Sequence, residues 1–155
     1  MNRSGETAPT TPAAPAAPSG GDAAAVAAVL QLYFDGLHFS DSARLRRAMH
    51  PAARYVCATD PAFIDLSMAE YFPIVDARPS PASRNEPRRD SIRSIEFAGP
   101  NAAFARVNCA IDDRYFTDLL TLVRTEGRWQ IIAKVFHYER HRTVAPDSGG
   151  DGDTP

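Results

Sequence analysis

The chain has 155 residues, of which 44% are hydrophobic and 23% are charged. This length and composition are typical of one globular domain with a hydrophobic core. The formal net charge is −2, so the sequence lacks the basic character of proteins that bind nucleic acids or anionic membranes. We see neither a signal-peptide pattern nor a membrane-spanning run, and we therefore expect a cytoplasmic protein.

Two segments of low complexity flank the expected domain. Residues 1–21 are rich in Pro, Ala, Ser, Thr and Gly, and residues 144–155 are similar but acidic. Such segments bury too little apolar surface to offset the entropy of ordering, so we expect both to be disordered. Residues 22–143 then form a single domain. Cys57 and Cys109 lie in apolar runs and are expected to be buried, reduced thiols. With no metal-ligand spacing in the sequence, we expect no metal or other cofactor.

The chain begins, after the first tail, with two predicted helices. The first runs from Asp22, its expected N-cap, to His38. Its apolar residues recur at spacings of three and four, as on one face of a helix: Val26, Val29, Leu30, Tyr33, Phe34 and Leu37. The second is short, begins after residues 40–42 and ends at residues 50–51, His-Pro.

Two short strands and a third helix are expected next. The strands are predicted at residues 53–58 and 63–67. Ser67 and Glu70 have the spacing of a capping box, which predicts a helix start at this point. Pro73 lies inside that helix and should kink it.

Four long strands complete the domain, at residues 89–97, 102–112, 114–124 and 128–138. Short turns join them, and Glu126-Gly127 are the two central residues of the last turn. Helices followed by an antiparallel meander indicate an α+β fold, with the helices on one face of the sheet.

This pattern resembles the nuclear-transport-factor-two-like (NTF2-like) superfamily over about residues 24–138. The resemblance is carried by "YFDGLHFSD", "MHPAARY" and "LVRTEGRWQIIAKVFH". Three stretches are similar to the branch known as putative lumazine-binding proteins: "DLSMAEY", "RPSPASRNEPRRDSI" and "YFTDLLTLVRTEGRWQIIAKVFH". The resemblance to this superfamily implies a cone-shaped barrel of three N-terminal helices packed on a strongly bent, mainly antiparallel sheet. It also implies an internal ligand pocket and a homodimer formed through the convex face of the sheet.

The last hairpin predicts which side chains line that pocket. An uninterrupted ladder from the Glu126-Gly127 turn places alternate residues on one face. The predicted pairs are Leu122–Ile131, Leu120–Ala133, Asp118–Val135 and Phe116–His137. This face is the more apolar one, so we assign it to the interior. Arg128, Gln130 and Lys134 are then expected on the convex face.

Three residues are candidates for catalysis. Asp118 is a candidate general acid or base, His137 lies diagonal to it in the predicted ladder, and Tyr33 could donate a hydrogen bond to a developing oxyanion. Apolar surroundings favour the protonated form of Asp118 unless a cation or hydrogen-bond donors compensate. A structural role remains open for each. Asp118 could bond a backbone N–H or Tyr33 and fix the register of the strands.

Eight further residues are candidates for ligand binding: Phe34, His38, Asp65, Phe116, Leu120, Trp129, Val135 and Arg78. Asp65 could replace the base that ketosteroid isomerases of this fold carry near the position of Cys57. Arg78 flanks a proline-rich loop and could bind an anionic group of a ligand.

Three functions are compatible with the sequence. The first is binding of a small apolar or aromatic organic molecule inside the cone. The second is a cofactor-independent isomerase, cyclase or hydrolase that uses Asp118. The polyketide cyclases of this fold use an acid and a histidine, to which Asp118 and His137 are comparable. The third is protein interaction through the convex sheet. The fold alone does not choose among them.

Overall fold

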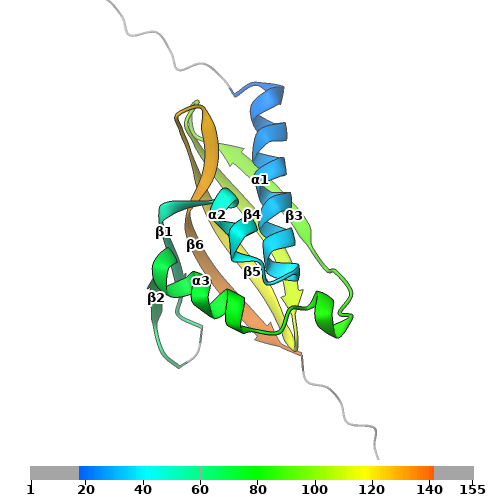
Figure 1. The fold of residues 1–155 in the computed structure, drawn as a ribbon. Coiled ribbons are helices and arrows are strands. Elements are labelled where there is room, and N and C mark those ends of the chain that lie inside the picture. The colour runs from blue at the N-terminus through cyan, green and yellow to red at the C-terminus, as the bar shows by residue number, and fades with distance from the viewer. Residues whose placement is uncertain (1–17, 60, 142–155) are drawn as a thin grey trace, which may run out of the picture.

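The computed structural model describes residues 18–59 and 61–141, which form three α-helices, one short 3₁₀ helix and six strands (Figure 1). The helices are α1 Gly20–His38, α2 Ser42–Ala48, α3 Met68–Ala77 and η1 Ala82–Arg84. The strands are β1 Met49–Cys57, β2 Ile64–Ser67, β3 Ser91–Phe97, β4 Ala102–Ile111, β5 Arg114–Thr125 and β6 Arg128–Arg140. Of the two tails predicted to be disordered, residues 1–17 and residues 144–155 lie outside the described residues.

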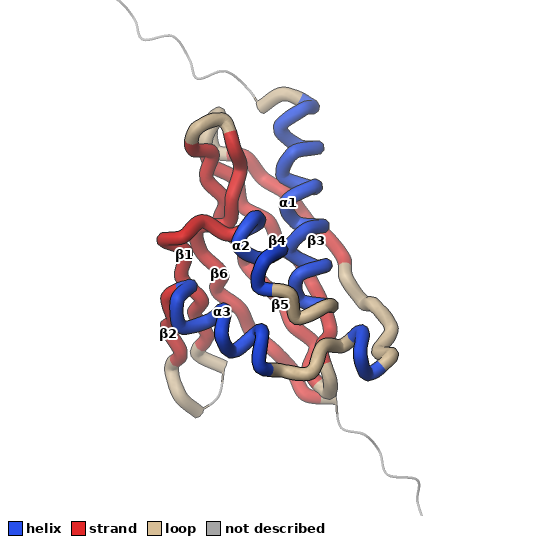
Figure 2. Tube along the Cα trace, in the orientation of Figure 1, coloured by secondary structure: helices blue, strands red, loops and turns tan. Residues whose placement is uncertain are grey.

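The six strands form one curved sheet in the order β2-β1-β6-β5-β4-β3. All neighbouring strands are antiparallel except β1 and β6, which are parallel. Helices α1, α2 and α3 lie against one face of this sheet (Figure 2). The α+β class with a strongly bent, mainly antiparallel sheet is therefore confirmed, although the sheet is not closed, because β2 and β3 are its edges. None of the helices described is both long and apolar enough to span a membrane.

The N-cap of helix α1 lies three residues earlier than the sequence predicted. Its N-cap is Ser19, whose side chain accepts a hydrogen bond from the Asp22 backbone N–H, and Asp22 in turn bonds the Ser19 backbone N–H at 3.1 Å. The prediction that Asp22 is the N-cap was therefore wrong, because Asp22 is the third residue of a capping box. Asp22 also contacts Arg124 at 3.2 Å and Trp129 at 3.4 Å. These contacts tie the start of α1 to the β5–β6 hairpin.

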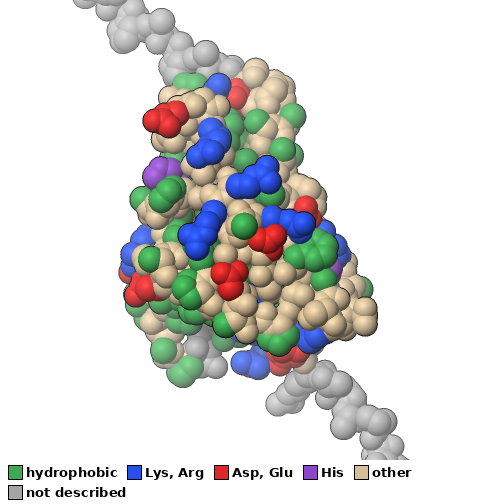
Figure 3. Space-filling view, in the orientation of Figure 1, with side chains coloured by type: hydrophobic (Ala, Val, Ile, Leu, Met, Phe, Trp, Pro, Cys, Tyr) green, Lys and Arg blue, Asp and Glu red, His purple; other side chains and the backbone are tan. Residues whose placement is uncertain are grey.

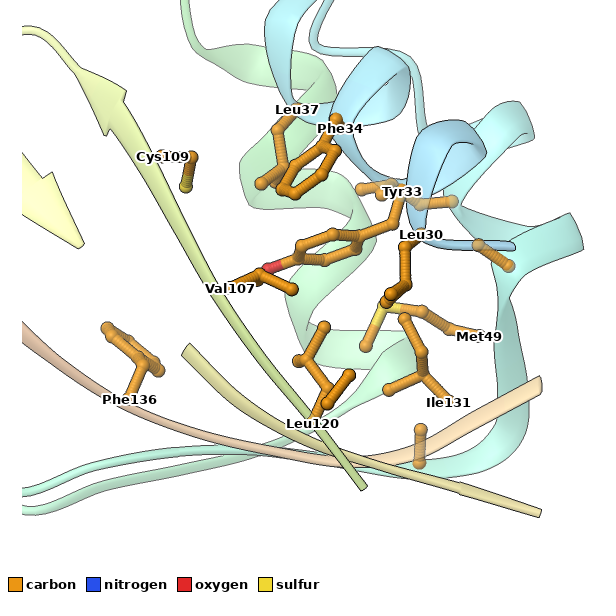
Figure 4. Packing of buried hydrophobic residues seen from close by; sticks show 14 of the residues in the cluster. Leu30, Tyr33, Phe34, Leu37, Met49, Val107, Cys109, Leu120, Ile131 and Phe136 are labelled. Carbon is orange, nitrogen blue, oxygen red and sulfur yellow. The ribbon is translucent and has the colours of Figure 1, made fainter. Parts of the chain in front are cut away.

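The core lies between the helices and the concave face of the sheet. The apolar stripe of α1 supplies Val26, Leu30, Tyr33, Phe34 and Leu37, all buried. Figure 4 shows Tyr33 extending from α1 toward the strand that carries Val107 and Cys109. Cys57 and Cys109 are buried, unpaired thiols, as predicted. On the outer surface of the helical layer, acidic and basic side chains are interspersed (Figure 3).

The β5–β6 hairpin starts in the predicted register and then departs from it. Glu126 and Gly127 have φ values of 52° and 73°, which suits a two-residue turn between twisted strands. Leu122 pairs with Ile131 as predicted, but Thr121 pairs with Ala133. Ile132 is thus an extra residue on β6, which makes a β-bulge.

This bulge exchanges the two faces of β6 beyond Ile131. Leu120 now lies opposite Lys134, and Asp118 lies opposite Phe136. Lys134 and Phe136 therefore point into the core, whereas Val135 and His137 are exposed on the convex face. The predicted interior positions of Val135 and His137, and the convex position of Lys134, were wrong, because one extra residue reverses the alternation of side chains.

Candidate functional site

Three polar side chains meet inside the core, one from each of α1, β5 and β6. The hydroxyl of Tyr33 donates a hydrogen bond to Asp118 Oδ2 at 2.7 Å, and Lys134 Nζ donates one to the Tyr33 hydroxyl at 2.7 Å. Lys134 Nζ also lies 3.4 Å from Asp118 Oδ2. Asp118 and Tyr33 are fully buried and Lys134 is 3% exposed. We call these three residues the interior cluster.

The strand pairing and the helix stripe position the cluster. Asp118 lies among buried alternate residues of β5, between Phe116 and Leu120. Tyr33 faces the sheet because it belongs to the apolar stripe of α1. Lys134 joins them only because the bulge at Ile132 turns it inward.

Aromatic rings surround the Lys134 ammonium. Its Nζ lies 4.7 Å from the ring centre of Phe136, 5.2 Å from Tyr55, 5.3 Å from Tyr33 and 5.8 Å from Phe116. Ring faces attract cations at such distances. Burial is the largest single effect and lowers the pKa of Lys134, but Asp118 together with Tyr71, Tyr55 and Cys109 raises it more, so the pKa lies above its ordinary value. Lys134 is therefore a cation at neutral pH.

The neighbouring weak acids remain protonated. Burial, followed by the charge of Asp118, raises the pKa of the Tyr33 hydroxyl well above its usual value. Burial likewise raises the pKa of Tyr55 to about 12, against the opposing effect of Lys134. The pKa of the Cys109 thiol is also raised, mainly by burial and then by Asp118. The Cys109 sulfur lies 3.9 Å from Asp118 Oδ2. Tyr33, Tyr55 and Cys109 therefore contribute no negative charge at neutral pH.

One oxygen of Asp118 has no hydrogen-bond partner. Oδ2 is contacted by Tyr33, Lys134 and Cys109, but Oδ1 is buried without a partner among the described residues. Nearly all buried polar atoms of native proteins are hydrogen-bonded, so an unpaired carboxylate oxygen calls for an explanation. It can accept a hydrogen bond or take up a proton.

Several predicted site residues adjoin the cluster. Phe116 contributes a ring beside Lys134, and Leu120 lies opposite Lys134 in the sheet. Phe34 is buried beside Tyr33, with ring centres 5.9 Å apart. The structure therefore brings Asp118, Tyr33, Phe34, Phe116 and Leu120 into one region.

Other predicted site residues lie elsewhere. His137 is exposed and bonds Thr59 at 2.9 Å, and Val135 is exposed on the same convex face. Asp65 is an exposed residue of β2 that pairs with Arg54 at 2.7 Å. Trp129 is buried at the hairpin end of the sheet, beside Asp22. His38 packs edge-on against Phe39 at 5.0 Å between ring centres. The predicted diagonal contact between Asp118 and His137 is absent, because the two side chains are on opposite faces of the sheet.

Arg78 lies at the C-terminal end of α3, where it is the C-cap residue. Its Nε donates a hydrogen bond to Ser40 Oγ at 3.3 Å. Its Nη2 is buried and, like Asp118 Oδ1, has no partner among the described residues.

Sequence reasoning missed Lys134, which is the cationic member of the cluster. A signal was present, because a lysine within the apolar run "WQIIAKVF" is unusual in a strand that is buried on one face. The alternation rule placed it outside, and only the bulge, which the sequence does not mark, places it inside.

The pockets on the surface of the described residues include four of about 250 to 340 Å³. None of them is lined by Asp118, Tyr33 or Lys134. The largest of the four lies partly on the convex face of the sheet, beside Leu119, Val135 and His137. Because Asp118, Tyr33 and Lys134 are buried, a ligand that reached the cluster would have to displace part of the layer that covers it.

The cluster has the elements of acid–base chemistry. A carboxylate with one unpaired oxygen can accept a proton, and a fixed ammonium with a phenol can stabilise negative charge on an oxygen atom. The same groups can bind a ligand that carries a hydrogen-bond donor and an acceptor.

Comparison with known proteins gives the following likenesses. A family model described as putative lumazine-binding matches residues 21–137. The chain is 25% identical over 115 residues to the aldolase FrzH of Cladobotryum sp, covering 73% of this chain and 88% of that protein. Among solved structures, an NTF2-like protein of unknown function from Shewanella baltica OS155 is 26% identical, with a TM-score of 0.68, covering 78% of this chain and 96% of that one. An NTF2-like protein of unknown function from Silicibacter pomeroyi DSS-3 is 21% identical, with a TM-score of 0.66, covering 77% and 97%.

Proposed function

The chain belongs to the putative lumazine-binding family of the NTF2-like superfamily, and from this premise we propose that it binds a small organic molecule against the interior cluster. The observation that carries the proposal is the buried, unpaired Oδ1 of Asp118. A ligand N–H or O–H group that reached this oxygen would complete its hydrogen bonding and would gain a charge-assisted contact.

The surroundings favour a ligand with an apolar or aromatic body. Phe34, Phe116, Leu120 and Phe136 are buried around the cluster, and ligand sites commonly combine such walls with a few polar groups. The cluster is closed to solvent here, so we propose that binding displaces the covering layer. Such rearrangements accompany binding in a minority of proteins.

The test is ligand capture by the purified protein. Native mass spectrometry of the purified chain should show a retained small molecule, and calorimetric titration with lumazine should give saturable binding. Asp118→Asn should weaken this binding by about tenfold or more, because an amide oxygen is a poorer acceptor than a carboxylate. The matched control is Asp65→Asn, which changes an exposed acid outside the cluster and should bind as the wild type does.

The binding proposal would be overturned by either of two results. One is a wild type that retains no molecule and does not bind lumazine. The other is an Asp118→Asn variant that is folded, as judged by circular dichroism, and still binds with unchanged affinity.

A second candidate is proton transfer at a carbon atom next to a carbonyl group. The contact of Lys134 with both Tyr33 and Asp118 favours it, and one relative of this chain is an aldolase. Asp118 would take the proton from the carbon, and the electron pair of the broken C–H bond would move to the carbonyl oxygen. Lys134 and Tyr33 would stabilise the resulting enolate oxygen. Return of the proton to another carbon would be isomerisation, and attack of the enolate carbon on a second carbonyl would be an aldol or cyclase step.

This candidate has its own measurement. NMR in D₂O should show exchange of the hydrogens next to the carbonyl in a panel of small ketones and keto acids, catalysed by the wild type. Asp118→Asn should abolish the exchange. If the wild type binds a ligand but catalyses no hydrogen exchange, the binding proposal stands and the enzymatic proposal is wrong.

We also propose that two copies associate through the convex face of the sheet. Val135 and Leu119 present apolar surface on that face, next to the pocket of about 340 Å³. Apolar surface that remains exposed on a monomer is common at protein interfaces.

A further inference from the structure

Arg78 is half-buried, and its guanidinium carries the second buried polar atom without a partner among the described residues. Its backbone N–H bonds Val75 O at 3.4 Å and its Nε bonds Ser40 Oγ at 3.3 Å, which fixes the side chain at the junction of α3 with the following loop. Its Nη2 is buried without a partner in the described part of the chain. A guanidinium always carries its charge and its donors, so it cannot become neutral to avoid this situation.

The contrast with a neighbouring arginine is clear. Arg88 lies ten residues on and pairs with Asp35 and Asp90, both at 2.7 Å. Within residues 18–59 and 61–141, no carboxylate oxygen lies within 4.0 Å of the Arg78 guanidinium. Arg78 thus combines a buried donor with an uncompensated charge.

The charge of Arg78 acts on side chains that contact the interior cluster. Its charge lowers the pKa of both Tyr55 and Cys109, although burial is the larger effect on each and raises both. Tyr55 is also in ring contact with Lys134, and the Cys109 sulfur contacts Asp118. Tyr71 of α3, the helix that Arg78 caps, stacks on Tyr55 with ring centres 4.2 Å apart. Helix α3 therefore connects Arg78 to the aromatic rings beside Lys134.

The charges in this region do not balance. Lys134 and Arg78 are cations, and Asp118 is the carboxylate that pairs with Lys134. The charge of Asp90 also raises the pKa of Cys109, but the Asp90 carboxylate already forms an ion pair with Arg88. One positive charge, that of Arg78, is left without a counterion.

We infer that the ligand is an organic acid whose carboxylate pairs with Arg78 while a hydrogen-bond donor of the same molecule reaches Asp118 Oδ1. This inference rests on the proposed binding function and names the chemical class of its ligand. A carboxylate fits because its two oxygens match the fork of a guanidinium, and such charge-assisted pairs are strong. The two unpaired atoms, one donor and one acceptor, are satisfied together by one ligand.

The experiment compares acids with their neutral amides. Benzoate with benzamide, and indole-3-acetate with indole-3-acetamide, are titrated calorimetrically into the full chain alongside lumazine. In the wild type each acid should bind about tenfold or more tightly than its amide. Arg78→Gln should remove this preference, and Arg78→Lys should keep part of it, because a lysine retains the charge but not the fork. The matched control is Arg89→Gln, which removes an exposed arginine in the same loop and should keep the preference.

The possible outcomes separate the two proposals. If the wild type binds lumazine but each acid binds no better than its amide, the inference about Arg78 is wrong and the binding function stands. The inference about Arg78 is also wrong if Arg78→Gln, folded by circular dichroism, keeps the preference for the acids. If the wild type binds neither lumazine, the acids nor the amides, both proposals fail.

Discussion

The ammonium of Lys134 lies 3.4 Å from Asp118 Oδ2, and Tyr33 bridges the two groups through hydrogen bonds of 2.7 Å on each side. The three residues come from β6, β5 and α1, so the contact joins the helical layer to the sheet. Burying a single charge costs several kcal/mol, and only a well-placed partner offsets this cost. Lys134 and Asp118 therefore each offset the cost of burying the other's charge. The second oxygen of Asp118, Oδ1, has no hydrogen-bond partner among the described residues.

Removal of Lys134 alone should strongly destabilise the fold. We expect Lys134→Met to lower the free energy of unfolding by about 3–5 kcal/mol, because it leaves a buried carboxylate without its cation. Urea denaturation followed by circular dichroism measures the change. The double variant Asp118→Leu with Lys134→Met should lose less than the sum of the two single losses, because it leaves neither charge unpaired. Strictly additive losses would show that the two charges do not stabilise each other.

High pH should unfold the protein through the same region. The pKa values of Tyr33 and Lys134 lie above their ordinary values of 10.0 and 10.5, and that of Tyr55 is about 12. The folded state therefore holds these protons more tightly than the unfolded chain, and its stability falls as the unfolded chain loses them. The Cys109 thiol, whose raised pKa starts from an ordinary value of 9.0, adds to this effect. The free energy of unfolding should therefore be steady up to about pH 8 and then decrease from about pH 9 through pH 12.

Two measurements check this pH dependence. Urea denaturation at successive pH values gives the stability, and tyrosinate absorbance follows the titration of the five tyrosines. Tyr55→Phe should show a shallower loss of stability above about pH 10, since it removes one of the late-titrating groups. If all tyrosines of the folded wild type titrate together near their ordinary value, the prediction is wrong.

The helices were predictable because their signals are local. The stripe from Val26 to Leu37 and the capping box of Ser67 and Glu70 depend only on nearby residues, and the structure contains both. The error at Asp22 was also local. Ser19 with Asp22 has the spacing of a capping box, and this signal in the sequence was available.

The face of Lys134 could not be predicted in the same way. The turn at Glu126-Gly127 fixes the register nearby, but Ile131 and Ile132 are both apolar, so either can face the core. An uninterrupted ladder would bury Val135 and expose Lys134. This arrangement agrees with the hydrophobicity of the two side chains, because valine is usually buried and lysine is usually exposed. The folded chain instead exposes Val135 and buries Lys134. The buried lysine is tolerated because it pairs with Asp118 and donates a hydrogen bond to Tyr33. That compensation is tertiary and has no local signature.

Gly36 should not tolerate a side chain. A Cβ at this position would lie 2.6 Å from Leu45 Cδ2 and 2.7 Å from Leu45 Cγ, so α1 and α2 approach too closely for it. We expect Gly36→Ala to lower the free energy of unfolding by about 1–3 kcal/mol, the usual range for overpacking. The control is Gly21→Ala, which is also in α1 but meets only Ser19 Oγ at 3.5 Å. It should be neutral or stabilising, since alanine favours helices. Thermal unfolding of both variants compares the effects. An equal rise of the unfolding temperature in both variants would show that Leu45 moves to make room for the side chain, and the prediction for Gly36 would be wrong.

Val135 should control self-association if the convex face is an interface. It is 47% exposed and lies beside Leu119 at the pocket on that face. We expect light scattering to give the wild type the mass of two chains at micromolar concentration, and Val135→Asp to shift it to one chain, because a charge at the centre of an apolar contact is costly to bury. Ile74→Asp is the matched control. Ile74 is 52% exposed, but it belongs to α3 on the other side of the molecule, so this variant should remain dimeric. A monomeric wild type, or an Ile74→Asp variant that dissociates as fully as Val135→Asp, would contradict the assignment of the interface to the convex sheet.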